Sequence, residues 1–220
     1  MTDEPFATWP LFGLRLRCGG TTLRPVRERD LAHLAAIQPD DYEHDPRVEV
    51  LPWMDVRQHR SRLVHQEYWR SMGTWSPASW CLGFAVEHEG AVVGVQSIEA
   101  DDFPSLRTVD SGSWLVAGVR GRGIGVAMRT AVLGLAFDHL GARAAITSAV
   151  RGNHASLGVS RHLGYRDNGV SLTASGSGVV ELVHLRLTAE EWRASGRGAD
   201  VDVDGLEQCL RWFGVAPADE

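Results

Sequence analysis

The chain lacks lysine altogether, because all 22 of its basic residues are arginine. A nucleotide-binding P-loop needs a lysine at the end of its glycine-rich segment, and Schiff-base catalysis needs a lysine amine. Both classes of site are therefore excluded. Long apolar runs are missing too, since none approaches the roughly 18 residues that a membrane-spanning helix requires. We expect no membrane partner.

The chain is also poor in residues that could form disulfides or bind a metal. Its three cysteines, Cys18, Cys81 and Cys209, are scattered and odd in number, so they predict neither a disulfide framework nor a zinc site. The nine histidines include no H-E-x-x-H or H-x₃-H pattern. We expect reduced, structural cysteines and a reaction without a metal.

Positive charge is not in excess, since the net charge is −6 over 220 residues. Residues 199–220 carry six acidic side chains against Arg211 alone, or −5, which leaves the rest of the chain nearly neutral. This balance indicates no nucleic-acid surface. The first five residues, Met-Thr-Asp-Glu-Pro, have neither the basic start nor the apolar stretch of a secretory signal, which favours a cytoplasmic protein.

The order of the expected elements indicates a mixed α/β fold with an antiparallel start rather than a regular βαβ repeat. The periodicities predict strands at 21–26, 81–87, 91–98, 109–116, 144–150 and 179–187, and helices at 30–37, 57–72, 124–140 and 153–163. We divide the chain into an N-terminal extension (1–20), one domain (21–195) and an acidic tail (196–220) that consists of a linker and a short helix. Residues 38–56 show neither helical nor strand periodicity. A loop of this length inside a compact domain is usually functional, most often a binding loop or lid.

The most informative segment is Val119-Arg-Gly-Arg-Gly-Ile-Gly125, which lies between a predicted strand and a predicted helix. Glycines allow a close approach by an anion, and the N–H groups and dipole of a helix N-terminus favour it. The G-x-G-x-x-G pattern of dinucleotide-binding folds fails because its third glycine would fall at Val126. The pattern Arg120-x-x-Gly123-x-Gly125 remains, with a phosphate group as the expected ligand.

This pattern resembles the acyl-CoA pyrophosphate motif, Arg/Gln-x-x-Gly-x-Gly/Ala, of the GNAT superfamily of N-acetyltransferases. The run Asn153-His-Ala-Ser156 and the Leu-Gly-Tyr that ends at Tyr165 are similar to a second segment of that family. Their form is typical of the branch that acetylates the N-termini of ribosomal proteins in bacteria (RimJ/RimL-like). The resemblance covers about residues 21–188. It implies the GNAT fold, a central, mostly antiparallel sheet that is bulged and splayed, flanked by helices, with the acyl-CoA cleft at the splay.

The resemblance also implies the residues that would hold acyl-CoA. The backbone amides of 119–125 would bind the pyrophosphate, and the edge of strand 109–116 would pair with the pantetheine. An N–H near Leu115 or Val116 would polarise the thioester carbonyl, and Asn153 would contact the pantetheine. The implied set is Leu115, Val116, Val119, Arg120, Gly121, Arg122, Gly123, Ile124, Gly125, Asn153 and Ser156.

Two residues match the catalytic positions of that branch. Asp110 stands where a glutamate often acts as the base through a water, although an aspartate of ordinary pKa is a poor base unless burial raises its pKa. Ser156 stands where an acid would protonate the leaving thiolate. Asp110 could instead only anchor a water or an arginine. Ser156 could instead be a serine in the first turn of a helix that hydrogen-bonds its own backbone.

The acceptor side is less specified. Trp53 in the long loop, Glu99 after its strand and Asp110 are the predicted substrate-binding residues, although an acidic turn in solvent also explains Glu99. The acceptor would be a primary amine on a small molecule, a protein N-terminus or a lysine.

The donor would be acetyl-CoA or another acyl-CoA such as succinyl-CoA. The amine would attack directly in a ternary complex, and the resemblance implies a homodimer or a higher homo-oligomer. The alternative is a CoA-binding regulatory module without catalysis, which the replacement of glutamate by Asp110 favours.

Overall fold

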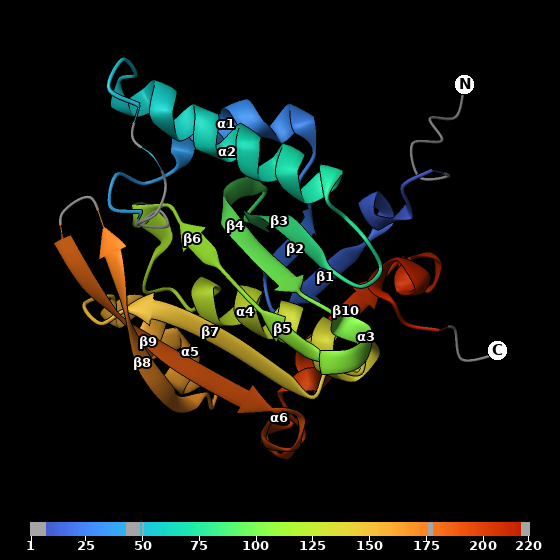
Figure 1. Ribbon diagram of the computed structural model, residues 1–220. Coiled ribbons are helices and arrows are strands. Elements are labelled where there is room, and N and C mark those ends of the chain that lie inside the picture. Colours follow the sequence, from blue (N-terminus) through green and yellow to red (C-terminus); the bar gives the residue numbers. More distant parts are fainter. Residues whose placement is uncertain (1–7, 43–48, 50, 176–177, 217–220) are drawn as a thin grey trace.

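The computed structural model describes residues 8–42, 49, 51–175 and 178–216. One twisted sheet runs through the molecule, with helices on both faces (Figure 1). Its strands are β1 (Arg15–Cys18), β2 (Thr21–Pro25), β3 (Trp80–His88), β4 (Ala91–Ala100), β5 (Thr108–Asp110), β6 (Ser113–Leu115), β7 (Ala144–Val150), β8 (Arg166–Ser175), β9 (Gly178–Thr188) and β10 (Val201–Asp204).

The helices follow the chain between these strands. They are α1 (Leu31–Ile37), α2 (Val56–Gly73), α3 (Phe103–Leu106), α4 (Ile124–Gly134), α5 (His154–His162) and α6 (Ala189–Ser195). A π-helical turn over Leu135–His139 continues α4. Short 3-10 turns occur at Pro10–Gly13, Glu28–Asp30, Ala117–Val119, Arg197–Asp200 and Glu207–Phe213.

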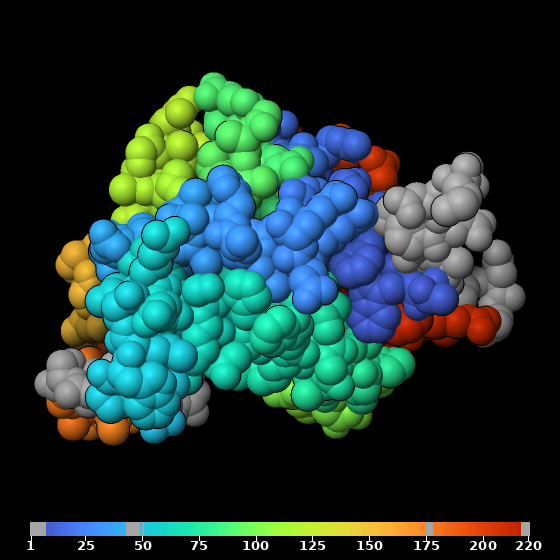
Figure 2. Space-filling view, turned by 90° about the horizontal axis from the view of Figure 1, so that it is seen from above, coloured from blue at the N-terminus to red at the C-terminus, as the bar shows by residue number. Residues whose placement is uncertain are grey.

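The strand order is β10-β1-β2-β3-β4-β5-β7-β9-β8, and all described pairings are antiparallel except the parallel pair of β5 with β7. This mixed, mostly antiparallel sheet is the predicted architecture. Helices α1 and α2 lie on one face, where Figure 2 shows them covering the sheet, and α4 packs on the other. The larger apolar core lies on the α4 face, and a smaller one around Leu31, Leu34 and Trp114 lies under α1.

The sheet opens beside Asp110. Strand β5 pairs with β7 through the register Thr108↔Ala144 to Asp110↔Ile146, but its continuation β6 pairs with β4 instead. Ser111 and Gly112 separate the two short strands without shifting the register against β4. The predicted single strand 109–116 is thus interrupted, and the sheet is splayed between β6 and β7.

The two ends of the described chain meet at one edge of the sheet. Strand β10, from the tail, pairs with β1, from the N-terminal extension, through the register Arg15↔Asp204 to Cys18↔Val201. The prediction of a linker over these tail residues was wrong, because Val201 and Val203 pack against the core between exposed aspartates, a strand alternation. The boundaries at 21 and 195 stay a prediction, although strands on both sides of them pair.

A glycine at the splay permits the close approach of β6 to β4. A Cβ on Gly94 would lie 2.2 Å from the carbonyl oxygen of Trp114 and 3.1 Å from the Cα of Leu115. We therefore expect Gly94→Ala to push β6 away and lower the free energy of unfolding by about 1–3 kcal/mol. Urea unfolding measures this.

The comparison variant is Gly158→Ala, within α5, where an added Cβ meets nothing within 4 Å. Alanine in a helix interior should raise the free energy of unfolding by about 0.5–1 kcal/mol. An unfolding midpoint of Gly94→Ala at or above that of the wild type would contradict the close approach.

Candidate active site

The glycine-rich turn has the geometry of an anion cradle. Gly121 and Gly123 have φ of 76° and 83°, which side-chain-bearing residues rarely adopt, and a Cβ on either would meet nothing within 4 Å. The turn therefore borders open space. Gly123 immediately precedes α4 and has no side chain to cap it, so the first N–H groups of the helix can bind an anion. These residues fit the pyrophosphate of an acyl-CoA.

The two arginines of the turn differ in their partners. Arg120 makes two hydrogen bonds to the carboxylate of Asp41, at 2.5 and 2.8 Å. Arg122 is half-exposed, and its Nη2 lies 3.3 Å from Oε1 of Glu89. That both arginines contact a phosphate stays a prediction.

The open edge of β6 carries a backbone N–H that could face the thioester. The N–H of Val116 donates to the carbonyl of Val93 at 2.9 Å and is therefore already used within the sheet. Because successive residues of a strand point their N–H groups to opposite sides, the N–H of Leu115 points away from β4, toward the splay. Of the two predicted donors, Leu115 is the available one.

A buried network of hydrogen bonds surrounds the interruption between β5 and β6. The carbonyl of Gly112 accepts hydrogen bonds from the N–H of Ser97 at 2.7 Å and from Nε2 of Gln96 at 2.9 Å. Behind them lies Arg129 of α4, only 2% exposed, whose Nη2 donates to Oγ of Ser113 at 3.2 Å. Sequence reasoning missed Gln96 and Arg129, because polar residues within apolar stretches give no signal of burial.

Asp110 is a partly buried carboxyl group with a raised pKa. Burial raises its pKa from 3.8 to about 6; the nearby carboxylate of Glu99 raises it as well, while the N–H of Ser111 and the charge of Arg129 oppose the shift. The Ser111 N–H donates to Oδ1 of Asp110 at 2.6 Å. A carboxylate with a pKa near 6 is ionised at neutral pH yet basic enough to accept a proton.

Asp110 belongs to a row of side chains that crosses three strands. The register places Cys81 of β3 opposite Glu99 of β4, and Glu99 opposite Asp110 of β5. Burial raises the pKa of Glu99, and the charges of Glu67 and Asp101 raise it further, although the Cys81 thiol opposes this. Burial and Glu99 raise the pKa of Cys81 well above its usual range. The thiol is therefore a poor nucleophile.

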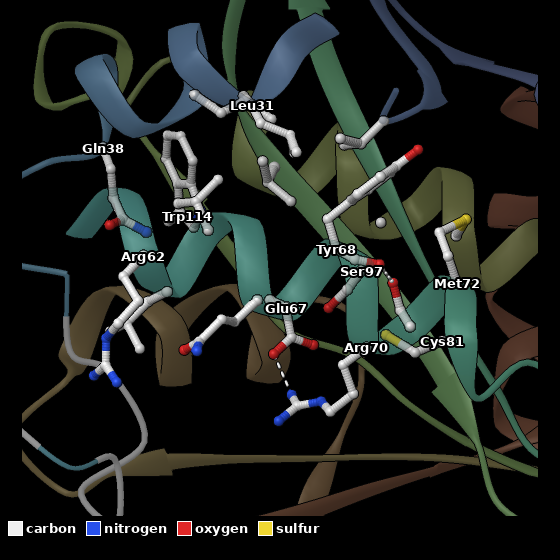
Figure 3. A pocket seen from close by; sticks show the side chains of 18 of the residues that line it. Leu31, Gln38, Arg62, Glu67, Tyr68, Arg70, Met72, Cys81, Ser97 and Trp114 are labelled. Carbon is white, nitrogen blue, oxygen red and sulfur yellow. Dashed lines mark hydrogen bonds and ion pairs between the residues drawn. The ribbon is translucent and has the colours of Figure 1, made fainter. Parts of the chain in front are cut away.

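Two cavities meet at Cys81 and Glu99. The first has a volume of about 450 Å³ and includes Asp110 in its wall; its other lining residues are Thr74, Ser79, Trp80, Ala100, Asp101, Leu106, Thr108, Val109 and Ile146. The second has a volume of about 430 Å³ and lies between α1, α2 and the sheet (Figure 3). Volumes of this size suit small ligands or the end of a peptide.

The larger part of the second cavity's wall is apolar. Its apolar residues are Val26, Leu31, Leu34, Leu63, Val64, Met72, Val95 and Trp114. The carboxylates in its wall are Glu49, Glu67 and Glu99, and Glu67 pairs with Arg70, as the dashed line in Figure 3 shows. Two guanidinium groups, of Arg62 and Arg70, lie in the same wall, so an apolar body with a polar or charged end matches it.

Sequence reasoning missed the α2 side of this cavity, although a signal was present. Among the 18 residues of α2 only Ser71 is buried, because the helix has no continuous apolar stripe. A helix without such a stripe does not pack closely along a sheet, so space for a cavity remains between them. Its capping box, formed by Asp55 and Gln58, fixes where it begins.

The second predicted segment lies beside the glycine-rich turn. A Cβ on Gly125 would contact Val159 of α5 at 3.5 Å, so the start of α4 lies beside the middle of α5. Asn153 caps α5, with its Oδ1 accepting the N–H of Ser156 at 3.0 Å. The amide NH₂ of Asn153 can still donate to a ligand. The proton-donor role of Ser156 stays a prediction.

Three tryptophans between residues 53 and 75 lie in different places. Trp53 is 73% exposed and is not among the described residues that line either cavity, so its role in acceptor binding stays a prediction. Trp69 is also exposed, and its ring N–H points to Glu28. Trp75 packs in the core between Trp9 and Trp80.

A comparison with known families identifies the family of this domain. Residues 21–166 match the family model described as an acetyltransferase (GNAT) domain. The chain belongs to the GNAT acetyltransferase family. Enzymes of this family use acyl-CoA, and the cradle and splay described above fit that co-substrate.

Solved structures share the fold of this GNAT acetyltransferase. Mycobacterium smegmatis RimJ in complex with CoA-disulfide has a TM-score of 0.65 at 22% identity, covering 86% of this chain and 97% of that chain. A GNAT-family acetyltransferase from Bacillus anthracis has a TM-score of 0.64 at 15% identity, covering 80% and 99%. A chimera of the Vibrio cholerae spermidine N-acetyltransferase SpeG with hSSAT has a TM-score of 0.60 at 11% identity, covering 80% and 99%.

No group of three or more residues suited to hold a metal ion occurs within the described ranges. Among the same residues, no helix is both long and apolar enough to span a membrane.

Proposed function

We propose that this GNAT acetyltransferase transfers the acetyl group of acetyl-CoA to a primary amine by direct attack, with Asp110 as the general base. The observation that supports this most is the position of Asp110, half-buried at the point where β5 and β7 part, with a pKa raised to about 6. In the family, this opening is where the thioester would enter from the glycine-rich turn.

The residues would act in sequence along the splay. Asp110 takes a proton from the acceptor's ammonium group, directly or through a water, and the freed lone pair attacks the thioester carbonyl carbon. The N–H of Leu115 stabilises the negative charge that develops on the carbonyl oxygen. The carbon–sulfur bond then breaks, and the CoA thiolate takes a proton, for which Ser156 is the predicted donor. No covalent enzyme intermediate is needed, and the raised pKa of Cys81 argues against one.

The carboxylates around the reaction point favour a cationic acceptor and a neutral acyl group. Glu99 and Asp110 face each other across β4 and β5, and Glu67 adds to the negative potential at Glu99. An approaching ammonium ion is attracted, whereas the carboxylate of a succinyl group would be repelled. We therefore favour acetyl-CoA as the donor. A small amine, a protein N-terminus and a lysine side chain all supply the required ammonium.

Release of CoA thiol from acetyl-CoA tests the proposal directly. The acceptor panel contains an alkyl monoamine, a diamine, a short peptide with a free N-terminus, and an N-terminally blocked lysine peptide. We expect turnover with at least one of them and weaker turnover with succinyl-CoA. Binding of CoA without turnover on any acceptor or donor would favour the non-catalytic alternative.

The pH dependence of the rate should report Asp110. The pKa of this carboxyl is raised from 3.8 to about 6, so it holds its proton below pH 6 and is ready to accept one above. The acceptor enters as the ammonium ion, whose proton Asp110 takes. A plot of log(kcat/KM) against pH is therefore expected to rise with a slope of about one below pH 6 and to level off between pH 6 and the pKa of the amine. A rise with a slope of one that continues through pH 6 to the pKa of the amine would contradict the role of Asp110.

A further inference from the structure

The guanidinium group of Arg120, the first residue of the phosphate motif, is occupied within the protein. Its Nη1 and Nη2 donate to the two oxygens of Asp41 at 2.5 and 2.8 Å, and its Nε donates to the carbonyl of Leu115 at 3.0 Å. One side chain thus joins three segments: the glycine-rich turn, the open edge of β6 and the stretch that follows α1.

The stretch that follows α1 is also a wall of the second cavity. Gln38, at the end of α1, lines that cavity, and Asp41 comes three residues later. The next residue, Tyr42, packs edge-on against Trp114, with ring centroids 6.3 Å apart, and Trp114 lines the same cavity. Figure 2 shows the end of α1 beside the turn that precedes α4. Residues 38–42 are therefore attached to the donor side at two adjacent points.

The ion pair contributes position more than stability. The side chains of Arg120 and Asp41 are 38% and 65% exposed, and exposed ion pairs typically contribute little to stability. Two parallel N–H···O bonds nevertheless fix the orientation of both groups. The guanidinium lowers the pKa of Asp41, so the pair remains ionised at neutral pH. Its charges cancel, and the turn gains little positive potential from Arg120.

We propose that Arg120 is a positioning residue that couples the pyrophosphate turn to the wall of the acceptor cavity, rather than a ligand of the phosphates. The coupling rests on the proposed function, because it presupposes that the turn binds CoA. When CoA orders the turn and the edge of β6, Arg120 transmits this order to Asp41 and so to residues 38–42. By linkage, an occupied acceptor cavity then favours CoA binding to the same degree.

Hydrogen exchange with CoA alone as the probe tests the coupling without any acceptor. In the wild type, saturating CoA should slow amide exchange in peptides that cover 38–42. In Asp41→Asn and Arg120→Met this slowing should be lost or reduced at least threefold, even at saturating CoA. In Arg122→Met, which leaves the Arg120–Asp41 pair intact, the slowing should persist at saturation. The matched control is Asp40→Asn, which breaks the neighbouring pair of Asp40 with Arg60 at 2.5 Å and should also retain the slowing.

The CoA affinity of the same proteins, measured by calorimetry, distinguishes a positioning role of Arg120 from a phosphate-binding role. The two roles predict different changes of affinity in Asp41→Asn. The positioning role predicts that Asp41→Asn does not tighten CoA binding. If Arg120 were instead a phosphate ligand restrained by Asp41, the freed arginine of Asp41→Asn would tighten binding, and Arg120→Met would weaken it as much as Arg122→Met. That pattern, or equal CoA-dependent slowing in all variants, would overturn the coupling alone. Absence of CoA binding by the wild type would overturn the proposed function as well.

Discussion

Replacing Asp110 with asparagine is expected to lower kcat by about 10²- to 10⁴-fold, the range that a positioned general base contributes. Asparagine has nearly the same shape, and its Oδ1 can still accept the Ser111 N–H, so the kink after β5 should persist. What is lost is the ability to take a proton from the acceptor amine. Steady-state kinetics with acetyl-CoA and the best acceptor of the panel measure this, and the pH profile should lose its bend near pH 6.

The same substitution should make the protein more stable, which separates lost chemistry from lost folding. Because burial and Glu99 raise the folded-state pKa of Asp110 above its unfolded value, the ionised form destabilises the fold. Asparagine removes that cost, by about 1–3 kcal/mol. The gain should be present in full above about pH 6 and should vanish below about pH 4, where the carboxyl is protonated in both states.

Asp101→Asn is the matched control for both measurements. Asp101 lines the same cavity but is exposed, so its loss should change kcat by less than about threefold and stability by less than about 0.5 kcal/mol. Equal losses of activity in the two variants would show that general negative charge, and not a specific base, supports catalysis.

Replacing Gly123 with glutamate is expected to weaken CoA binding by about 100-fold, or about 2.7 kcal/mol. Its φ of 83° disfavours any side chain by roughly 1–2 kcal/mol, and a carboxylate at the start of α4 would repel the pyrophosphate. Because the space around its Cβ is open, the protein itself should still fold. Calorimetric titration with CoA measures the affinity.

Gly196→Glu supplies the control for backbone strain. Gly196 ends α6 with a φ of 67°, and an added Cβ there meets nothing within 4 Å, so the strain is similar at a site remote from the turn. Its CoA affinity should equal that of the wild type. Undiminished affinity in Gly123→Glu would remove the pyrophosphate from this turn.

Much of the candidate site could be predicted because many of its residues lie close together in the sequence. The glycine spacing of 121–125 selects positive φ and a helix start within a few residues, and Asn153 and Ser156 meet within the first turn of one helix. The absence of lysine removed the competing phosphate sites before any geometry was known. The strand that carries Asp110 followed from alternation, although its interruption at Ser111 and Gly112 did not, since contacts from β4 impose it.

The remaining features depend on residues far apart in the chain. The row of Cys81, Glu99 and Asp110 exists only because β3, β4 and β5 pair in one register. That pairing raises the pKa of Asp110, a quantity set by burial and neighbouring charge. Likewise, no local pattern relates Arg120 to Asp41, 79 residues earlier, or brings β10 to β1.

By itself, the sequence predicted the family, the mixed α/β fold and a glycine-rich turn before a helix, because each depends on short-range spacing. Only the tertiary structure raises the pKa of Asp110 to about 6, points the N–H of Leu115 rather than that of Val116 toward the splay, and places Arg120 against an aspartate. Each of these depends on which distant groups surround an atom and exclude water from it.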